Sequence, residues 1–189
     1  MPIPMTLDRF SEALRDGMLS LPQDCKAMLR LAEDPELDDE SRVLACGALL
    51  HVLSGANAIP GVKGTLAFAD DVIVLRLTTE RIENRSPAVV AAHRADDPDV
   101  YEPMREQLAV IREYLGDLMV VLDRTVDALP KMQFEGHDAR GCALDDESIT
   151  WLYDSVHEAI VERLELPEEA VVRAVKGAGE LRGFLKQRI

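Results

Sequence analysis

The sequence predicts an all-α protein, folded as a multi-helix bundle of the up-and-down type. Apolar residues recur three or four positions apart along most of the chain, which is the spacing that places them on one face of an α-helix. Of the 189 residues, 47 % are hydrophobic but only 4 % are aromatic, so the core must consist mainly of aliphatic side chains. The clearest single pattern is a heptad-like apolar series in the second half of the chain.

The first half of the chain is expected to form four helices, at about 6–19, 22–34, 39–53 and 65–82. The third is apolar on nearly every side, which is typical of a helix at the centre of a core, and Asp39 or Ser41 can cap it. Residues 72–75 in the fourth have the composition of a strand. Helical spacing of Phe68, Val72 and the following apolar positions nevertheless favours a helix.

The second half is expected to hold one long helix and two shorter ones. Residues 84–103 have the composition of a linker, with a short helical piece near 88–93. The long helix is expected to span Met104–Leu129, between Pro103 and Pro130. A loop of residues 131–143, a helix capped by Asp145 and a last helix opened by Pro167 complete the chain. We expect two halves, 1–95 and 96–189, that form one compact domain.

The long helix carries an apolar seam, formed by Met104, Leu108, Ile111, Leu115, Leu118, Leu122 and Leu129. Spacings that alternate between four and three are typical of a helix that packs along its whole length. The favoured interpretation is the spine of a bundle within one chain, because the other helices need a partner. The alternative is a dimer interface through Leu108, Leu115 and Leu122.

Charge and cysteine usage limit the classes of function. With 35 acidic and 21 basic residues the net charge is −14, which disfavours nucleic acid and anionic membrane surfaces. The three cysteines form no CxxC pair, and the N-terminus does not read as a signal peptide. We therefore expect a cytoplasmic protein without a cofactor, for which a protein partner or self-association remains open.

One stretch, beginning at His51, reads HVLSGANAIPGVKGTLAFADDVIVL. It resembles the YkvA-type family, a small helical domain of unknown function found in many bacterial proteins. The resemblance covers about residues 39–82 and is carried by Leu53, Ser54, Ile59, Pro60, Asp70 and Asp71. It implies a helix, a tight turn and a second helix. The turn departs from the family pattern, with Gly55 and Gly64 in place of prolines, Asn57 and Gly61 in place of aspartates, and Ala67 in place of a glycine.

The same stretch contains the strongest candidate for a polar site. Gly55, Gly61 and Gly64 permit positive φ in a tight turn, and Pro60 stiffens it. Asp70 and Asp71 follow in an apolar helix, where consecutive side chains point about 100° apart, so only one of them is expected to face the core readily. A buried carboxylate needs a partner, and the candidates are His51 and Asn57. A structural clasp between two helices is favoured over a cation or ligand site.

No catalytic motif is complete, and no metal spacing is found among the histidines. The His137-Asp138 dipeptide is expected in a loop, and Cys142 beside His137 is expected to be incidental. We therefore expect a non-enzymatic protein-interaction or regulatory module. The alternative is a metal- or small-ligand-dependent, hydrolase-like enzyme centred on Asp70 and Asp71. An enzyme should open this cluster to solvent, whereas a module should enclose it.

Overall fold

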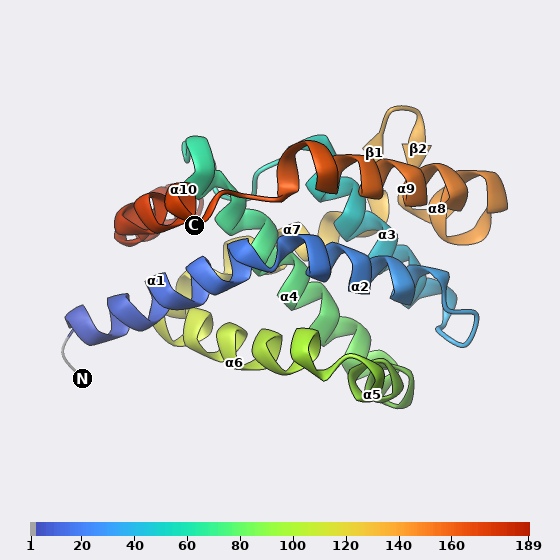
Figure 1. Cartoon of the computed structure of the whole chain (residues 1–189), viewed down its shortest axis with the longest axis horizontal. Helices are drawn as coiled ribbons and strands as arrows, with labels where there is room; N and C mark the ends of the chain where they lie inside the picture. Colours follow the sequence, from blue (N-terminus) through green and yellow to red (C-terminus); the bar gives the residue numbers. More distant parts are fainter. Residues whose placement is uncertain (1–2) are drawn as a thin grey trace.

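The computed structural model describes residues 3–189, with side chains from residue 6 onward, and confirms the all-α prediction (Figure 1). The α-helices in the first half are α1 (Ile3–Leu19), α2 (Leu21–Glu33), α3 (Asp39–Ser54), α4 (Phe68–Arg85) and α5 (Pro87–Asp96). Those in the second half are α6 (Pro98–Leu115), α7 (Met119–Ala128), α8 (Ala139–Leu144), α9 (Asp146–Ala159), α10 (Glu168–Ala174) and α11 (Leu181–Lys186). Among the described residues the sheet structure is one short antiparallel hairpin, β1 (Gln133–Phe134) with β2 (His137–Asp138).

Helices α3 and α4 lie at the centre of the bundle. In Figure 1, α1 and α2 run nearly end to end across the molecule, with α6 along their lower side and α9 and the C-terminal helices along their upper side. Helix α1 packs against α4, α6 and the 3₁₀ segment at Val175–Glu180. Helix α3 is buried along most of its length, as its apolar composition predicts. Apolar side chains from both halves of the chain join in one hydrophobic cluster.

The helix ends follow ordinary capping chemistry. The side chain of Asp38 accepts a hydrogen bond from the Ser41 amide at 3.1 Å, so Asp38, one residue earlier than expected, is the N-cap of α3. The prediction of Asp145 as a cap is confirmed, since its carboxylate accepts from the Ser148 amide at 3.0 Å. Gly47 of α3 lies so close to the Leu129 carbonyl that an added Cβ would be 2.2 Å from that oxygen.

The linker predicted at 84–103 is wrong, because helices α5 and α6 occupy most of it, although the short helical piece expected near 88–93 lies within α5. The polar composition of this segment gives α5 no apolar stripe that would indicate a helix, since Val90 alone among its residues is buried. The long helix predicted over Met104–Leu129 is wrong at its start and in its middle, although α7 ends next to the predicted end at Leu129. Helix α6 begins at Pro98, so that Pro103 lies inside it, and it stops at Leu115 because Gly116 takes φ +54°.

The apolar seam continues through this break, since the 3₁₀ turn at Gly116–Leu118 keeps the following helix on the core. Leu108, Leu115 and Leu122 are all buried against other helices of the same chain. Their packing agrees with the favoured interpretation of a bundle spine. A dimer interface through these three side chains would require the bundle to open.

The predicted loop at 131–143 is only partly a loop, because it contains the hairpin and α8. The last helix is divided into α10, a 3₁₀ segment at Val175–Glu180 and α11. Gly177 and Gly179 lie in the 3₁₀ segment, where glycine weakens the α-helix. Within the described residues, no helix combines the length and the apolar character that a bilayer crossing requires.

Candidate functional site

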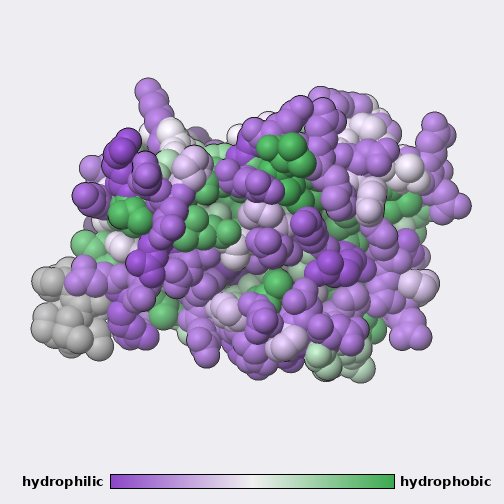
Figure 2. Space-filling model, viewed as in Figure 1, coloured by the Kyte–Doolittle hydropathy of each residue, from purple (hydrophilic) through white to green (hydrophobic). Residues whose placement is uncertain are grey.

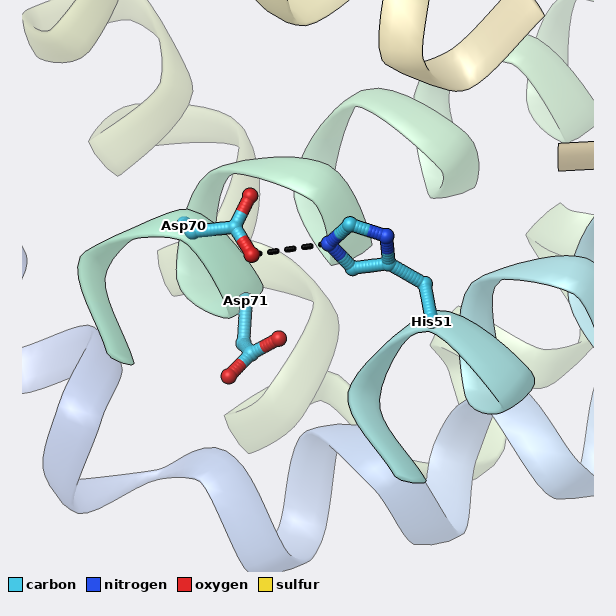
Figure 3. Close-up of side chains that lie close together, drawn as sticks. All are labelled: His51, Asp70 and Asp71. Carbon is cyan, nitrogen blue, oxygen red and sulfur yellow. Dashed lines mark hydrogen bonds and ion pairs between the residues drawn. The ribbon is translucent and has the colours of Figure 1, made fainter. Parts of the chain in front are cut away.

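His51, Asp70 and Asp71 meet in the core where α3 ends and α4 begins (Figure 3). His51 lies in the last turn of α3, and the two aspartates lie in the first turn of α4. The Nε2 atom of His51 and the Oδ2 atom of Asp70 are 2.7 Å apart, and these side chains are 3 % and 2 % exposed. The structure therefore brings together the histidine and carboxylate that the sequence singled out.

The second oxygen of Asp70 holds the turn between the helices. The Ala58 amide donates to Asp70 Oδ1 at 3.0 Å. Asn57, a second predicted partner of the carboxylates, does not play that role: its side-chain oxygen accepts from the Ile59 amide at 2.8 Å instead. An asparagine that bonds its own backbone two residues on stabilises a turn, so Asn57 belongs to the turn and not to the buried pair.

Asp71 differs from Asp70 because its Oδ1 atom has no hydrogen-bond partner among the residues that the structure describes. The side chain is 7 % exposed, and its Oδ1 atom is buried without a donor. Burial raises the pKa of Asp71 well above its usual range, the neighbouring Asp70 raises it further, and Arg163 opposes both effects. The expectation that only one of the two aspartates would readily face the core is wrong, since the start of α4 is covered on both sides.

The turn residues take the conformations that the sequence predicts. Gly55, Gly61 and Gly64 have φ values of +71°, +92° and +66°. Gly61 also lies under Phe184 of α11, where an added Cβ would be 3.0 Å from the ring. Pro60 lies between these glycines in the irregular segment before α4. The C-terminal helix α11 thus covers part of the turn.

Arg163 binds the end of α3 next to the cluster. It lies on a π-helical turn, Ile160–Leu164, that follows α9, and its guanidinium donates to the Val52 and Leu53 carbonyls at 2.8 and 3.1 Å. These carbonyls belong to the last turn of α3, which lacks intrahelical donors. The five principal cavities formed by the described residues lie elsewhere, and none has His51, Asp70 or Asp71 in its wall.

The other residues considered for chemistry have structural contacts. His137 stacks on Trp151 with ring centroids 3.8 Å apart, and Asp138 caps α8 by accepting from the Gly141 amide at 2.6 Å. Cys142 is fully buried, and burial raises the pKa of its thiol to about 11. Since the thiolate is the reactive form, this cysteine is a poor nucleophile near neutral pH.

Sequence reasoning missed a second buried polar group. Arg76 of α4 is 2 % exposed; its Nη1 donates to Asp24 Oδ2 of α2 at 3.1 Å and its Nη2 to Gln107 Oε1 of α6 at 2.6 Å. Burial raises the pKa of Asp24 although Arg76 and Ser20 lower it. The one available signal was an arginine within the apolar run at 72–77 of α4, because a charge in that position needs a partner.

The donor set of the first cluster is suited to a metal ion. One ligand atom each from His51, Asp70 and Asp71 lies within 4.8 Å of the others, and this is the one such group found among the described residues. An imidazole nitrogen and two carboxylate oxygens are common metal ligands. The chain matches no protein-family profile, no curated protein and no solved structure. Its resemblance to the YkvA-type family therefore stays a prediction.

Proposed function

We propose that this chain is a non-enzymatic protein-interaction module. The main support is the enclosure of His51, Asp70 and Asp71 in the core, away from the principal cavities. A catalytic base or nucleophile must lie within hydrogen-bonding reach of its substrate, directly or through one water. A hydrolase-like enzyme centred on Asp70 would need a substrate path that this packing closes.

A partner surface is suggested by the outer side of α9 and the π-helical turn after it. Tyr153 of α9 and Val161 of the π-helical turn after it are 47 % and 78 % exposed. Figure 2 shows hydrophobic surface over the segment that follows α9. A groove of about 410 Å³ lies along the first half of α9, lined by Glu33, Arg42, Asp146, Ile149, Thr150 and Tyr153. Exposed apolar side chains in a polar rim are characteristic of interaction surfaces.

The charge of this surface favours a basic partner. Exposed acidic residues surround Tyr153 and Val161 along the same stretch: Asp146, Glu147, Asp154, Glu158, Glu162 and Glu165. Arg163, the basic residue among them, is held on the carbonyls of α3. Two copies of such a face would repel each other, whereas a segment with Lys and Arg around apolar side chains would be attracted. The proposed partner is therefore a different protein with a basic amphipathic segment.

Site-specific photo-crosslinking tests this proposal. A photoreactive phenylalanine at position 153, in the full chain expressed in its own host, should crosslink one protein through a Lys- and Arg-rich segment. Val161→Asp should remove the crosslink, because it puts a charge at the apolar centre. The matched control is Val120→Asp, since Val120 is 38 % exposed on α7, and it should leave the crosslink intact. The proposal is wrong if position 153 crosslinks nothing, or if Val161→Asp leaves the product unchanged.

A further inference from the structure

Within the buried cluster, Asp71 is the residue whose burial is not explained by the contacts of its carboxylate. Its Oδ1 atom is buried and accepts no hydrogen bond, although the side chain is more than nine-tenths buried. Figure 3 shows this carboxylate beside the Asp70–His51 pair, with no interaction drawn to either residue. Buried carboxylates in proteins are paired with a cation, hydrogen-bonded, or bound to a metal. Within this cluster, the missing partner is a positive charge between three ligand atoms.

We propose that His51, Asp70 and Asp71 bind one divalent first-row transition-metal ion at the junction of α3 and α4. The site offers one nitrogen and two oxygens whose positions lie within 4.8 Å of one another. These atoms come from side chains that the two helices already hold in place. The proposal is independent of the proposed interaction function, because an enclosed ion would stabilise this junction whatever the surface of the protein binds.

Small side-chain rotations would convert the present arrangement into a coordination site. Ligands at about 2.1 Å from a metal lie roughly 3.0–3.4 Å from each other in octahedral or tetrahedral geometry. The His51–Asp70 separation of 2.7 Å would thus open by several tenths of an ångström, and the Asp71 oxygen would turn inward. The Ala58 amide on Asp70 Oδ1 would stay in place and orient the ligand.

The donor set also selects the class of ion. Mg²⁺ and Ca²⁺ prefer sites made of oxygen atoms, whereas an imidazole ligand suits Zn²⁺ and its first-row neighbours. Two carboxylates balance the charge of a divalent ion. Three protein ligands leave one position for a water molecule, and enclosure of the site keeps substrates away from it. The ion would therefore stabilise the fold and would not act as a catalyst.

Metal counting on matched variants tests the proposal, with Zn²⁺ as the probe. Because the site is enclosed, the full chain is refolded from denaturant with Zn²⁺, desalted and examined by native and elemental mass spectrometry. Wild type should keep one Zn²⁺ per chain and melt at a higher temperature than the chelator-treated protein. Asp71→Asn should keep none and show no such shift. The control is His93→Gln, because His93 Nε2 and Asp34 Oδ2 are also 2.7 Å apart but have no third ligand; this variant should keep one.

The proposal is overturned if wild type retains no Zn²⁺, if Asp71→Asn retains it, or if His93→Gln loses it. If Asp71→Asn does not fold, wild type loaded with Co²⁺ decides the question. A Co²⁺ ion in the site should shift the NMR signals of the His51 ring strongly and leave those of His93 close to their usual positions. Unshifted His51 signals at one bound Co²⁺ per chain would place the ion elsewhere and refute the proposal.

Discussion

His51 Nε2 and Asp70 Oδ2 lie 2.7 Å apart at one end of the antiparallel α3–α4 pair, and a second polar contact holds the opposite end. There Asp38, the N-cap of α3, accepts from Arg85 Nη2 and from Ser86 Oγ, both at 2.8 Å. The two central helices are thus fixed at both ends, once inside the core and once near the surface. The helix angle is set by these two contacts and by the aliphatic packing between them.

The buried contact is expected to contribute more stability than a similar contact in a more open place. Loss of one partner of a buried pair typically costs several kcal/mol, so His51→Ala should lower the free energy of unfolding by about 3 kcal/mol. For a chain of this size each kcal/mol corresponds to about 2–4 °C in melting temperature. His93→Ala, which breaks a His–Asp pair of equal length whose side chains are 18 % and 22 % exposed, should cost about 1 kcal/mol or less. Equal losses of melting temperature in His51→Ala and His93→Ala would contradict the expectation that the buried contact contributes more stability.

The surface contact is expected to depend on pH. Partial burial alone would raise the pKa of Asp38, but hydrogen bonds from Ser41, Arg85 and Ser86 outweigh it and hold that pKa well below the usual range. A carboxyl with a lowered folded-state pKa adds stability above its ordinary pKa near 4, and this stability is lost as the pH falls through the folded value. Asp38→Asn should thus destabilise the protein at pH 7.

Urea unfolding of wild type and Asp38→Asn between pH 7 and pH 3 checks this prediction. The difference between the two proteins should be about 1 kcal/mol at neutral pH, as for other N-cap losses, and should shrink below pH 4. A difference that stays constant with pH would show that the charge of Asp38 contributes nothing.

The Arg76–Asp24 pair is expected to behave as one unit. Arg76→Met should cost about 3–5 kcal/mol, because it leaves the Asp24 carboxylate buried without its cation. Asp24→Leu combined with Arg76→Met should recover much of that loss, since an apolar pair of similar volume needs no hydrogen bonds. Chemical unfolding of Arg76→Met, Asp24→Leu and the double variant measures the coupling between the two positions. Additive losses would mean that the two groups do not interact.

Glycine positions provide a test of the close approach between α3 and the end of α7. Gly47→Ala would place a methyl group 2.2 Å from the Leu129 carbonyl oxygen, so it should destabilise by at least about 1–3 kcal/mol. Gly183→Ala, at a helical position with open space around it, should be neutral or stabilise by up to about 1 kcal/mol. Melting temperatures of both variants check the contrast, and a stable Gly47→Ala protein would contradict this packing.

Local patterns were sufficient to predict the central helix pair and part of its polar cluster. Helix α3 is a nearly continuous apolar run and α4 keeps apolar residues at helical spacing, and the intervening glycines take the positive φ values expected of them. His51 and Asp70 flank that short turn, so their meeting follows from a helical hairpin. Asn57 was assigned to the cluster wrongly, because an asparagine in a turn bonds its own backbone more readily than a side chain above it.

The features that the sequence did not predict depend on distant parts of the chain. Arg76 and Asp24 are 52 residues apart and join different helices, so no local spacing relates them. Burial of Asp71 depends on how other parts of the chain cover the first turn of α4. The break at Gly116 could not be predicted from the heptad pattern, because the 3₁₀ turn keeps the apolar positions after it on the buried side of the helix.

The most direct test of the enclosed cluster compares Asp70→Asn with Asp71→Asn in the presence of a metal chelator. The substitution is the same at adjacent positions, but Asp70 accepts from His51 and Ala58 whereas Asp71 Oδ1 accepts from nothing. The free energy of unfolding should fall by about 2–4 kcal/mol in Asp70→Asn. It should stay unchanged or rise in Asp71→Asn, which replaces a buried carboxyl group whose Oδ1 atom has no hydrogen-bond partner. Equal losses in the two variants, or no loss in Asp70→Asn, would contradict the account.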